Sequence, residues 1–88
     1  MAPRDDERVL EHIRRLMDVG LLPIGAIGGR RVGVGSMRQR CDGCDEEVAI
    51  GEPEIELTFF GTLVVHLHPH CANLYEAELR RRGVPPSC

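Results

Sequence analysis

The chain has 88 residues, of which 42% are hydrophobic and 28% are charged, and its formal net charge is −3. A single domain of this size buries a low fraction of its surface, and with three aromatic side chains and no tryptophan its core needs reinforcement. The negative balance excludes a uniformly basic nucleic-acid binder, and no apolar run approaches the roughly 20 residues of a membrane span.

An amphipathic helix is predicted over residues 5–19. Val9, Ile13 and Leu16 recur at helical spacing and form one apolar stripe. Acidic residues precede the stripe, where they favour the start of a helix, and Gly20 follows it as a C-terminal cap. A stripe of this size needs a partner surface. It can pack against a hairpin of the same chain or against a second copy, and we expect the homodimer.

The next segment, residues 25–37, contains five glycines. Glycine is unfavourable in helices, so the segment is predicted to be a connector, or a short strand or hairpin around Gly28 and Gly29. A phosphate-binding loop is not expected, because no Gly-Lys-Ser/Thr motif and no helical pattern follow.

The strongest pattern in the chain is C-x2-C-x23-H-x2-C, formed by Cys41, Cys44, His68 and Cys71. Two residues between the members of a pair let both side chains reach one ion, and the long gap leaves room for a hairpin. Thiolates and imidazole are the preferred ligands of structural zinc, and three cysteines with one histidine fill its tetrahedral shell. The pattern therefore predicts one zinc ion, which would reinforce the small core.

One ligand position has an alternative. His66 shares a strand face with His68 and could replace it, whereas His70 is expected to face solvent or a backbone carbonyl. Redox or disulfide pairing of the cysteines is disfavoured, because no βαβ pattern surrounds them and the chain opens without an apolar signal segment. We therefore expect a reducing, cytoplasmic setting, in which Cys88 is a free thiol without a role.

Strands are predicted between the two ligand pairs, and a helix after them. The strands cover residues 47–50, 54–59 and 63–67, of which the second alternates polar and apolar side chains. The helix covers residues 71–82; Pro69 suits its first turn, and Gly83 and Pro85 end it.

This order of a Cys-x2-Cys turn, a hairpin and a helix resembles the treble-clef group of zinc fingers. The C-x2-C…H-x2-C pattern resembles the first half of a LIM domain and the zinc finger of poly(ADP-ribose) polymerases. The region also resembles short bacterial proteins of unknown function, a resemblance that implies no activity. The resemblance covers residues 38–82, and the second C-x2-C module of a LIM domain is missing.

The segments together predict an α+β fold. It is a small zinc-stabilised domain with an N-terminal helix and exit segment (1–24), a glycine-rich connector or short hairpin (25–37), a treble-clef-like finger of hairpin and C-terminal helix (38–84) and a tail (85–88).

Three classes of function follow from this organisation. The first is a non-enzymatic protein-interaction or adaptor module, and the second is a nucleic-acid-binding finger. A small metallo-enzyme is the remote third class, because a closed Cys3His shell leaves no position for a substrate. The nucleic-acid class would use Arg30, Arg31, Arg38, Arg40, Arg80, Arg81 and Arg82. Seven acids within residues 42–56 follow the Arg38–Arg40 segment directly, so we expect acids to neutralise arginines and favour the adaptor.

Overall fold

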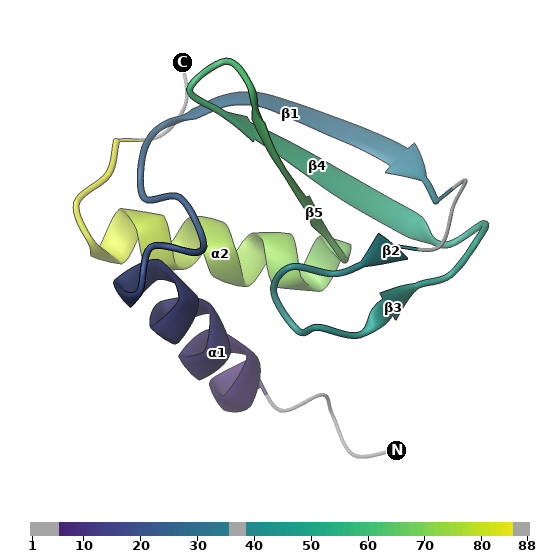
Figure 1. Ribbon diagram of the computed structural model, residues 1–88, viewed down its shortest axis with the longest axis horizontal. Helices are drawn as coiled ribbons and strands as arrows, with labels where there is room; N and C mark the ends of the chain where they lie inside the picture. The colour runs from purple at the N-terminus through teal and green to yellow at the C-terminus, as the bar shows by residue number, and fades with distance from the viewer. Residues whose placement is uncertain (1–5, 36–38, 86–88) are drawn as a thin grey trace.

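The computed structural model describes residues 6–35 and 39–85. The elements in chain order are α1 (Asp6–Asp18), β1 (Ile27–Val34), β2 (Gln39–Arg40), β3 (Glu47–Val48), β4 (Pro53–Phe59), β5 (Leu63–Leu67) and α2 (Pro69–Arg81). In the described residues, the strands form a three-stranded antiparallel sheet of order β1-β4-β5 and a separate two-stranded ladder of β2 and β3. The α+β prediction is confirmed (Figure 1).

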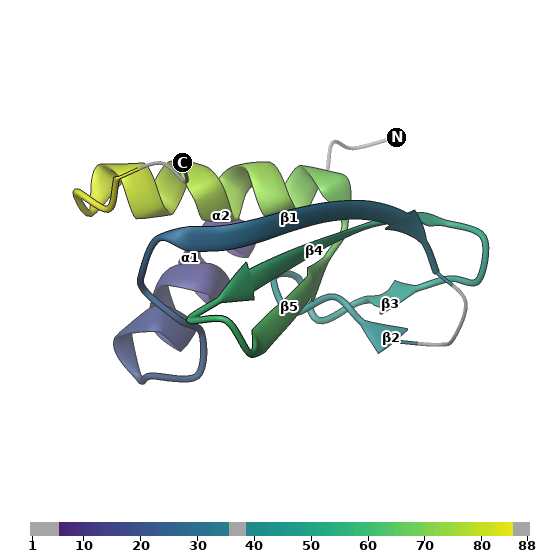
Figure 2. The same cartoon turned by 90° about the horizontal axis from the view of Figure 1, so that it is seen from above.

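Helix α2 covers one face of the sheet and carries most of the packing. It contacts β4 and β5 on one side and α1 on the other, and Figure 2 shows it alongside the three long strands. Alternate residues of β4, among them Leu57 and Phe59, are fully buried beneath it. Tyr75 of α2 is buried against Phe59, and its hydroxyl donates to the carbonyl of Pro23 at 2.6 Å. The exit segment after α1 is thereby fixed to α2.

The glycine-rich segment is a strand of the main sheet, so of the predicted alternatives the structure has the short strand rather than a connector or a local hairpin. Residues Ile27–Val34 pair antiparallel with β4, with one register shift between Ile27 and Gly29. Pairing uses backbone groups, which every residue supplies, and therefore outweighs the weak local preference of glycine against strands. Most β1 side chains are exposed because β1 is an edge strand.

Both helices end at the glycines that the sequence indicated. Gly20 has φ +81°, and the N–H of Leu21 donates to the carbonyl of Leu16 at 2.8 Å. Gly83 closes α2 in the same way with φ +85°. A left-handed residue after the last helical turn satisfies orphan carbonyls, and glycine adopts it without strain. Neither α1 nor α2, the two helices in the described residues, is long and apolar enough to span a membrane.

The apolar stripe of α1 is buried within the chain. Val9, Ile13 and Met17 are buried, and Leu16 packs at the edge of the same core. The surface that covers them includes α2, whereas the sequence predicted the hairpin as the partner within the chain. The homodimer stays a prediction, but the unpartnered stripe that motivated it is absent from the described chain.

Candidate metal centre

The first ligand pair lies in the turn between β2 and β3, a unit that we call the knuckle (residues 39–48). The N–H of Cys41 donates to the carbonyl of Glu46 at 2.8 Å, and the N–H of Asp45 donates back to the carbonyl of Cys41 at 2.9 Å. Asp45 has φ +63°, a left-handed conformation that short polar side chains tolerate. These bonds tighten the turn that holds Cys41 and Cys44.

The second ligand pair lies where β5 runs into α2. His68 occupies the N-cap position of α2, Pro69 opens its first turn as predicted, and Cys71 follows in that turn. The N–H groups at a helix N-terminus favour negative charge, which suits the net negative charge that three thiolates with one divalent ion would carry here. β2 contacts β5, which brings the knuckle to this end of α2.

The four predicted ligands converge on one point. The Sγ atoms of Cys41, Cys44 and Cys71 and a ring nitrogen of His68 all lie within 4.8 Å of one another and could hold a metal ion. Ligand atoms around a tetrahedral zinc lie about 3.3–3.8 Å apart, given Zn–S near 2.3 Å and Zn–N near 2.0 Å. Cys41 and Cys71 are fully buried and His68 is 9% exposed, so bulk water is largely excluded from the cluster.

The imidazole of His68 is oriented by a backbone carbonyl. Its Nε2 lies 3.2 Å from the carbonyl oxygen of Glu47, and its Nδ1 lies 3.3 Å from Sγ of Cys44. A carbonyl can only accept, so Nε2 carries the hydrogen and Nδ1 presents its lone pair to the thiols. Metal-bound histidines are commonly fixed by such a bond from the second ring nitrogen. The arrangement therefore fits His68 as a ligand through Nδ1.

Cys41 is the thiol that is prepared to ionise first. Its Sγ accepts the backbone N–H groups of Gly43 at 3.4 Å and His68 at 3.3 Å. A hydrogen bond from Cys71, together with those from backbone N–H groups, lowers the pKa of Cys41 despite its burial. The hydrogen bond to Cys41 and burial raise the pKa of Cys71, and burial raises that of Cys44. A cation that supplies positive charge would release the protons of these two thiols.

Comparisons of the chain with family models, curated proteins and solved structures found no match. The function is therefore inferred from the geometry of the site.

The other two candidate histidines lie away from the thiols. Nδ1 of His66 lies 3.1 Å from a carboxylate oxygen of Glu54, and Nε2 of His70 lies 2.6 Å from a carboxylate oxygen of Asp6. The structure thus brings His68, rather than its neighbours, into the cysteine cluster. Cys88 lies outside the described residues.

The candidate nucleic-acid residues are spread over different elements, and Arg38 lies outside the described residues. Arg30 of β1 pairs with Glu76 of α2, and Arg40 of β2 lies 3.7 Å from Asp45. Arg81 and Arg82 both bind Glu78, while Arg31 and Arg80 are exposed. The carboxylates of these pairs come mainly from α2, and only Asp45 belongs to the acidic segment expected to neutralise the arginines.

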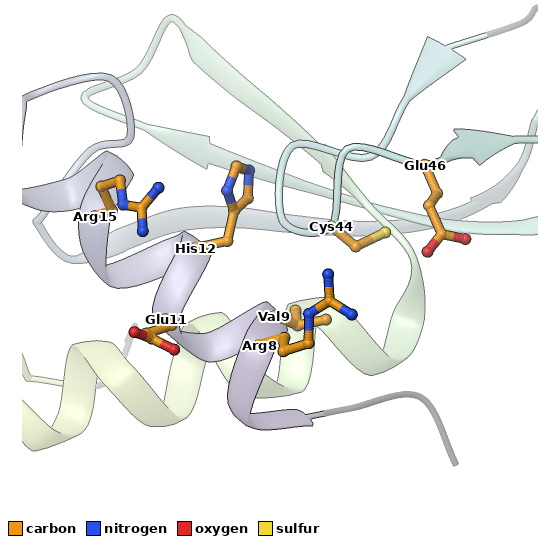
Figure 3. A pocket seen from close by; sticks show the side chains of 7 residues that line it. All are labelled: Arg8, Val9, Glu11, His12, Arg15, Cys44 and Glu46. Carbon is orange, nitrogen blue, oxygen red and sulfur yellow. The ribbon is translucent and has the colours of Figure 1, made fainter. Parts of the chain in front are cut away.

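A cavity of about 390 Å³ separates α1 from the knuckle. Its lining residues are Arg8, Val9, Glu11, His12, Arg15, Cys44 and Glu46. Figure 3 shows Arg8 and His12 extending from α1 toward the turn that carries Cys44. Cys44 is the partly buried thiol of the cluster, and it lines this cavity. Sequence patterns gave His12 no role, and the structure places it on the cavity wall.

Gly43 is a site requirement that the motif did not reveal. A Cβ at this position would lie 3.0 Å from Cβ of Cys71 and 3.1 Å from Cδ2 of Leu67. We expect Gly43→Ala to push the knuckle away from α2 and to lower the free energy of unfolding by about 1–3 kcal/mol. Urea unfolding of the zinc-loaded protein measures this loss. Gly33→Ala is the control, because a Cβ there has no neighbour within 4 Å; equal effects of the two substitutions would contradict the steric explanation.

Proposed function

We propose that this protein is a small, non-enzymatic binding module built around one structural zinc ion. The observation that carries the proposal is the convergence of Cys41, Cys44, His68 and Cys71 within 4.8 Å, with Nε2 of His68 fixed on a carbonyl. Three thiolates and one imidazole form a donor set that binds zinc in preference to harder divalent cations. They also fill the tetrahedral shell, which leaves no position for a reacting water or substrate.

The order of elements supports assigning the finger to the treble-clef type. The knuckle supplies two ligands, the β4–β5 hairpin follows, and α2 begins with the other two. In this arrangement the ion joins the knuckle, which has a ladder of only two residue pairs, to the N-terminus of α2. We propose that α1 and β1 are additions to this finger that cover α2 and extend the sheet.

Exposed apolar side chains support a protein partner. Phe60 is 69% exposed and has φ +56°, a conformation that costs energy for a bulky side chain. Val32 on the edge strand is 71% exposed. Aromatic residues, phenylalanine included, are enriched at protein interfaces, and strained backbone is concentrated at functional sites. An adaptor role therefore has more support than the alternative role in nucleic-acid binding.

Zinc content tests the proposal directly. Elemental analysis of protein expressed with ample metal should give one zinc per chain, and Cys44→Ser should lose it. Cys88→Ser is the matched control and should keep the full equivalent. A content below about half an equivalent in the unaltered protein, or a Cys44→Ser variant that keeps its zinc, would overturn the ligand assignment.

Weak binding of nucleic acid is expected, because Arg30, Arg40, Arg81 and Arg82 are already paired with carboxylates. Phosphate contacts require cations that converge on one face. Fluorescence anisotropy with labelled duplex and single-stranded DNA at low salt should detect no binding tighter than about 10 µM. Micromolar binding that weakens when Arg30 and Arg31 are changed to alanine would instead favour the nucleic-acid function.

A further inference from the structure

A second group of metal-ligating side chains lies on the opposite face of the sheet from α2. Glu56 of β4 pairs in register with His66 of β5, so their side chains project from the same face. Glu54 stands two residues before Glu56 and shares this face. The intervening Ile55 is buried on the other face, toward the core.

The three side chains converge on one ring nitrogen. Nδ1 of His66 lies 3.1 Å from Oε1 of Glu54 and 3.7 Å from Oε2 of Glu56. One ligand atom from each residue lies within 4.8 Å of the other two. A single N–H on Nδ1 can donate a good hydrogen bond to only one carboxylate. The negative charge of the second carboxylate, which lies close to the first, is then not fully balanced by the imidazole.

Burial makes this arrangement more costly. The side chain of Glu54 is 8% exposed, whereas those of His66 and Glu56 are 28% and 32% exposed. A carboxylate removed from water needs a compensating charge or a metal ion. With a neutral imidazole the group carries two negative charges, which one divalent cation would balance.

We propose that Glu54, Glu56 and His66 form a second metal site, which takes a divalent cation of the manganese, iron or zinc class. Two carboxylate oxygens and one imidazole nitrogen match the donor preferences of these ions. Calcium would require six to eight oxygen ligands, roughly, and is disfavoured by this small set. The three protein ligands leave coordination positions open on the exposed side of the site, unlike the closed Cys3His cluster.

The position of His66 is fixed by the knuckle. The backbone N–H of His66 donates to Oδ2 of Asp42 at 2.9 Å, and the N–H of Asp42 donates to the carbonyl of His66 at 2.8 Å. Asp42 directly follows the ligand Cys41, so the folded knuckle holds His66 in place for the second site. Arg31 of β1 opposes the binding of a cation, because it pairs in register with Glu56 and its positive charge shares this face.

Manganese is the probe that separates the two sites, because it prefers oxygen ligands over the thiolates that hold zinc. The full chain, loaded with one zinc, is titrated with Mn²⁺, and amide resonances are followed for paramagnetic broadening. We expect broadening to begin at residues 54–56 and 66. The Glu56→Gln variant should weaken Mn²⁺ binding at least about tenfold. Substitution of a residue that only hydrogen-bonds to a metal ligand already costs that much affinity, and Glu56 is proposed to be a ligand itself. Arg31→Gln should tighten binding.

Glu11→Gln is the charge-matched control, because Glu11 is exposed on α1, and it should leave the affinity for Mn²⁺ unchanged. Any of three results would overturn the second site. These are broadening that starts at other acidic residues, no binding below millimolar Mn²⁺, and a Glu56→Gln variant that binds Mn²⁺ as tightly as the unaltered chain. Failure of the Cys3His site is distinguishable, because it would appear as missing zinc before any manganese is added.

Discussion

Removal of zinc should unfold this domain at neutral pH. Structural zinc contributes about 10–16 kcal/mol of apparent binding free energy in small fingers. The net stability of domains is about 5–15 kcal/mol, and small ones lie at the low end. The buried thiols of Cys41 and Cys71 belong to the core itself, so loss of the ion removes the link between the knuckle and α2. Circular dichroism during chelation should show loss of the folded signal, and added zinc should restore it.

Variants separate the metal effect from chelator artefacts. Cys71→Ser should resemble the chelated protein, because it removes a fully buried ligand. His70→Gln, one residue earlier and on the exposed side of α2, should keep a cooperative melt in the zinc-loaded form. A chelated protein that retains the melting temperature of the loaded form would show that the ion is dispensable for folding.

Glu78→Gln should cause a clear loss of stability although it lies outside the metal site. The Glu78 side chain is 1% exposed and accepts hydrogen bonds from Arg14 of α1 at 2.9 Å, and from Arg81 of α2 and its C-cap residue Arg82 at 2.6 and 2.7 Å. It therefore joins the two helices, and its removal leaves three guanidinium groups without their shared anion. We expect urea unfolding at pH 7 to show that the free energy of unfolding falls by about 1–3 kcal/mol. The loss is smaller than for a fully buried ion pair, because the arginines are partly exposed.

The same carboxylate gives stability a defined pH dependence. Hydrogen bonds from Arg81, then from Arg82 and Arg14, lower the pKa of Glu78 from 4.5 to about 2. A lowered pKa means that the stabilising contribution is complete above 4.5 and declines as the pH falls toward about 2. The difference in unfolding free energy between wild type and Glu78→Gln should therefore stay constant from neutral pH down to about 5 and shrink below 4.5.

Glu76→Gln is the control on the same helix. Glu76 pairs with Arg30 and its side chain is 22% exposed, so its removal should cost less than about 1 kcal/mol. Equal losses for the two variants, or a difference that does not change with pH, would contradict the assigned role of Glu78.

Local patterns predicted the elements whose signals are local. The period-2 alternation of residues 54–59 and the glycines at positions 20 and 83 gave β4 and the two helix ends correctly. For residues 27–34 a short strand was only one of the predicted alternatives, because the outcome depends on distant pairing with β4 rather than on these residues alone. In α1 the third buried position is Met17, one residue beyond the predicted Leu16, because α2 sets which part of the stripe is covered.

The ligand residues of the candidate metal centre were predictable because their spacing is a sequence property. The parts that orient them were not. The carbonyl of Glu47 that fixes His68, and the close approach of Gly43 to Cys71, arise from backbone geometry with no residue-type signal. Glu54 and Glu56 read as the solvent face of an alternating strand, and only the register with β5 shows that His66 joins them.

X-ray absorption at the zinc edge tests the central claim most directly, because it distinguishes sulfur from lighter ligand atoms and gives their distances from the ion. The assignment of Cys41, Cys44, His68 and Cys71 predicts one equivalent of zinc with three sulfur ligands at about 2.3 Å and one nitrogen ligand at about 2.0–2.1 Å. A coordination shell with two or fewer sulfur ligands, or one without scattering from the outer atoms of an imidazole ring, would contradict it.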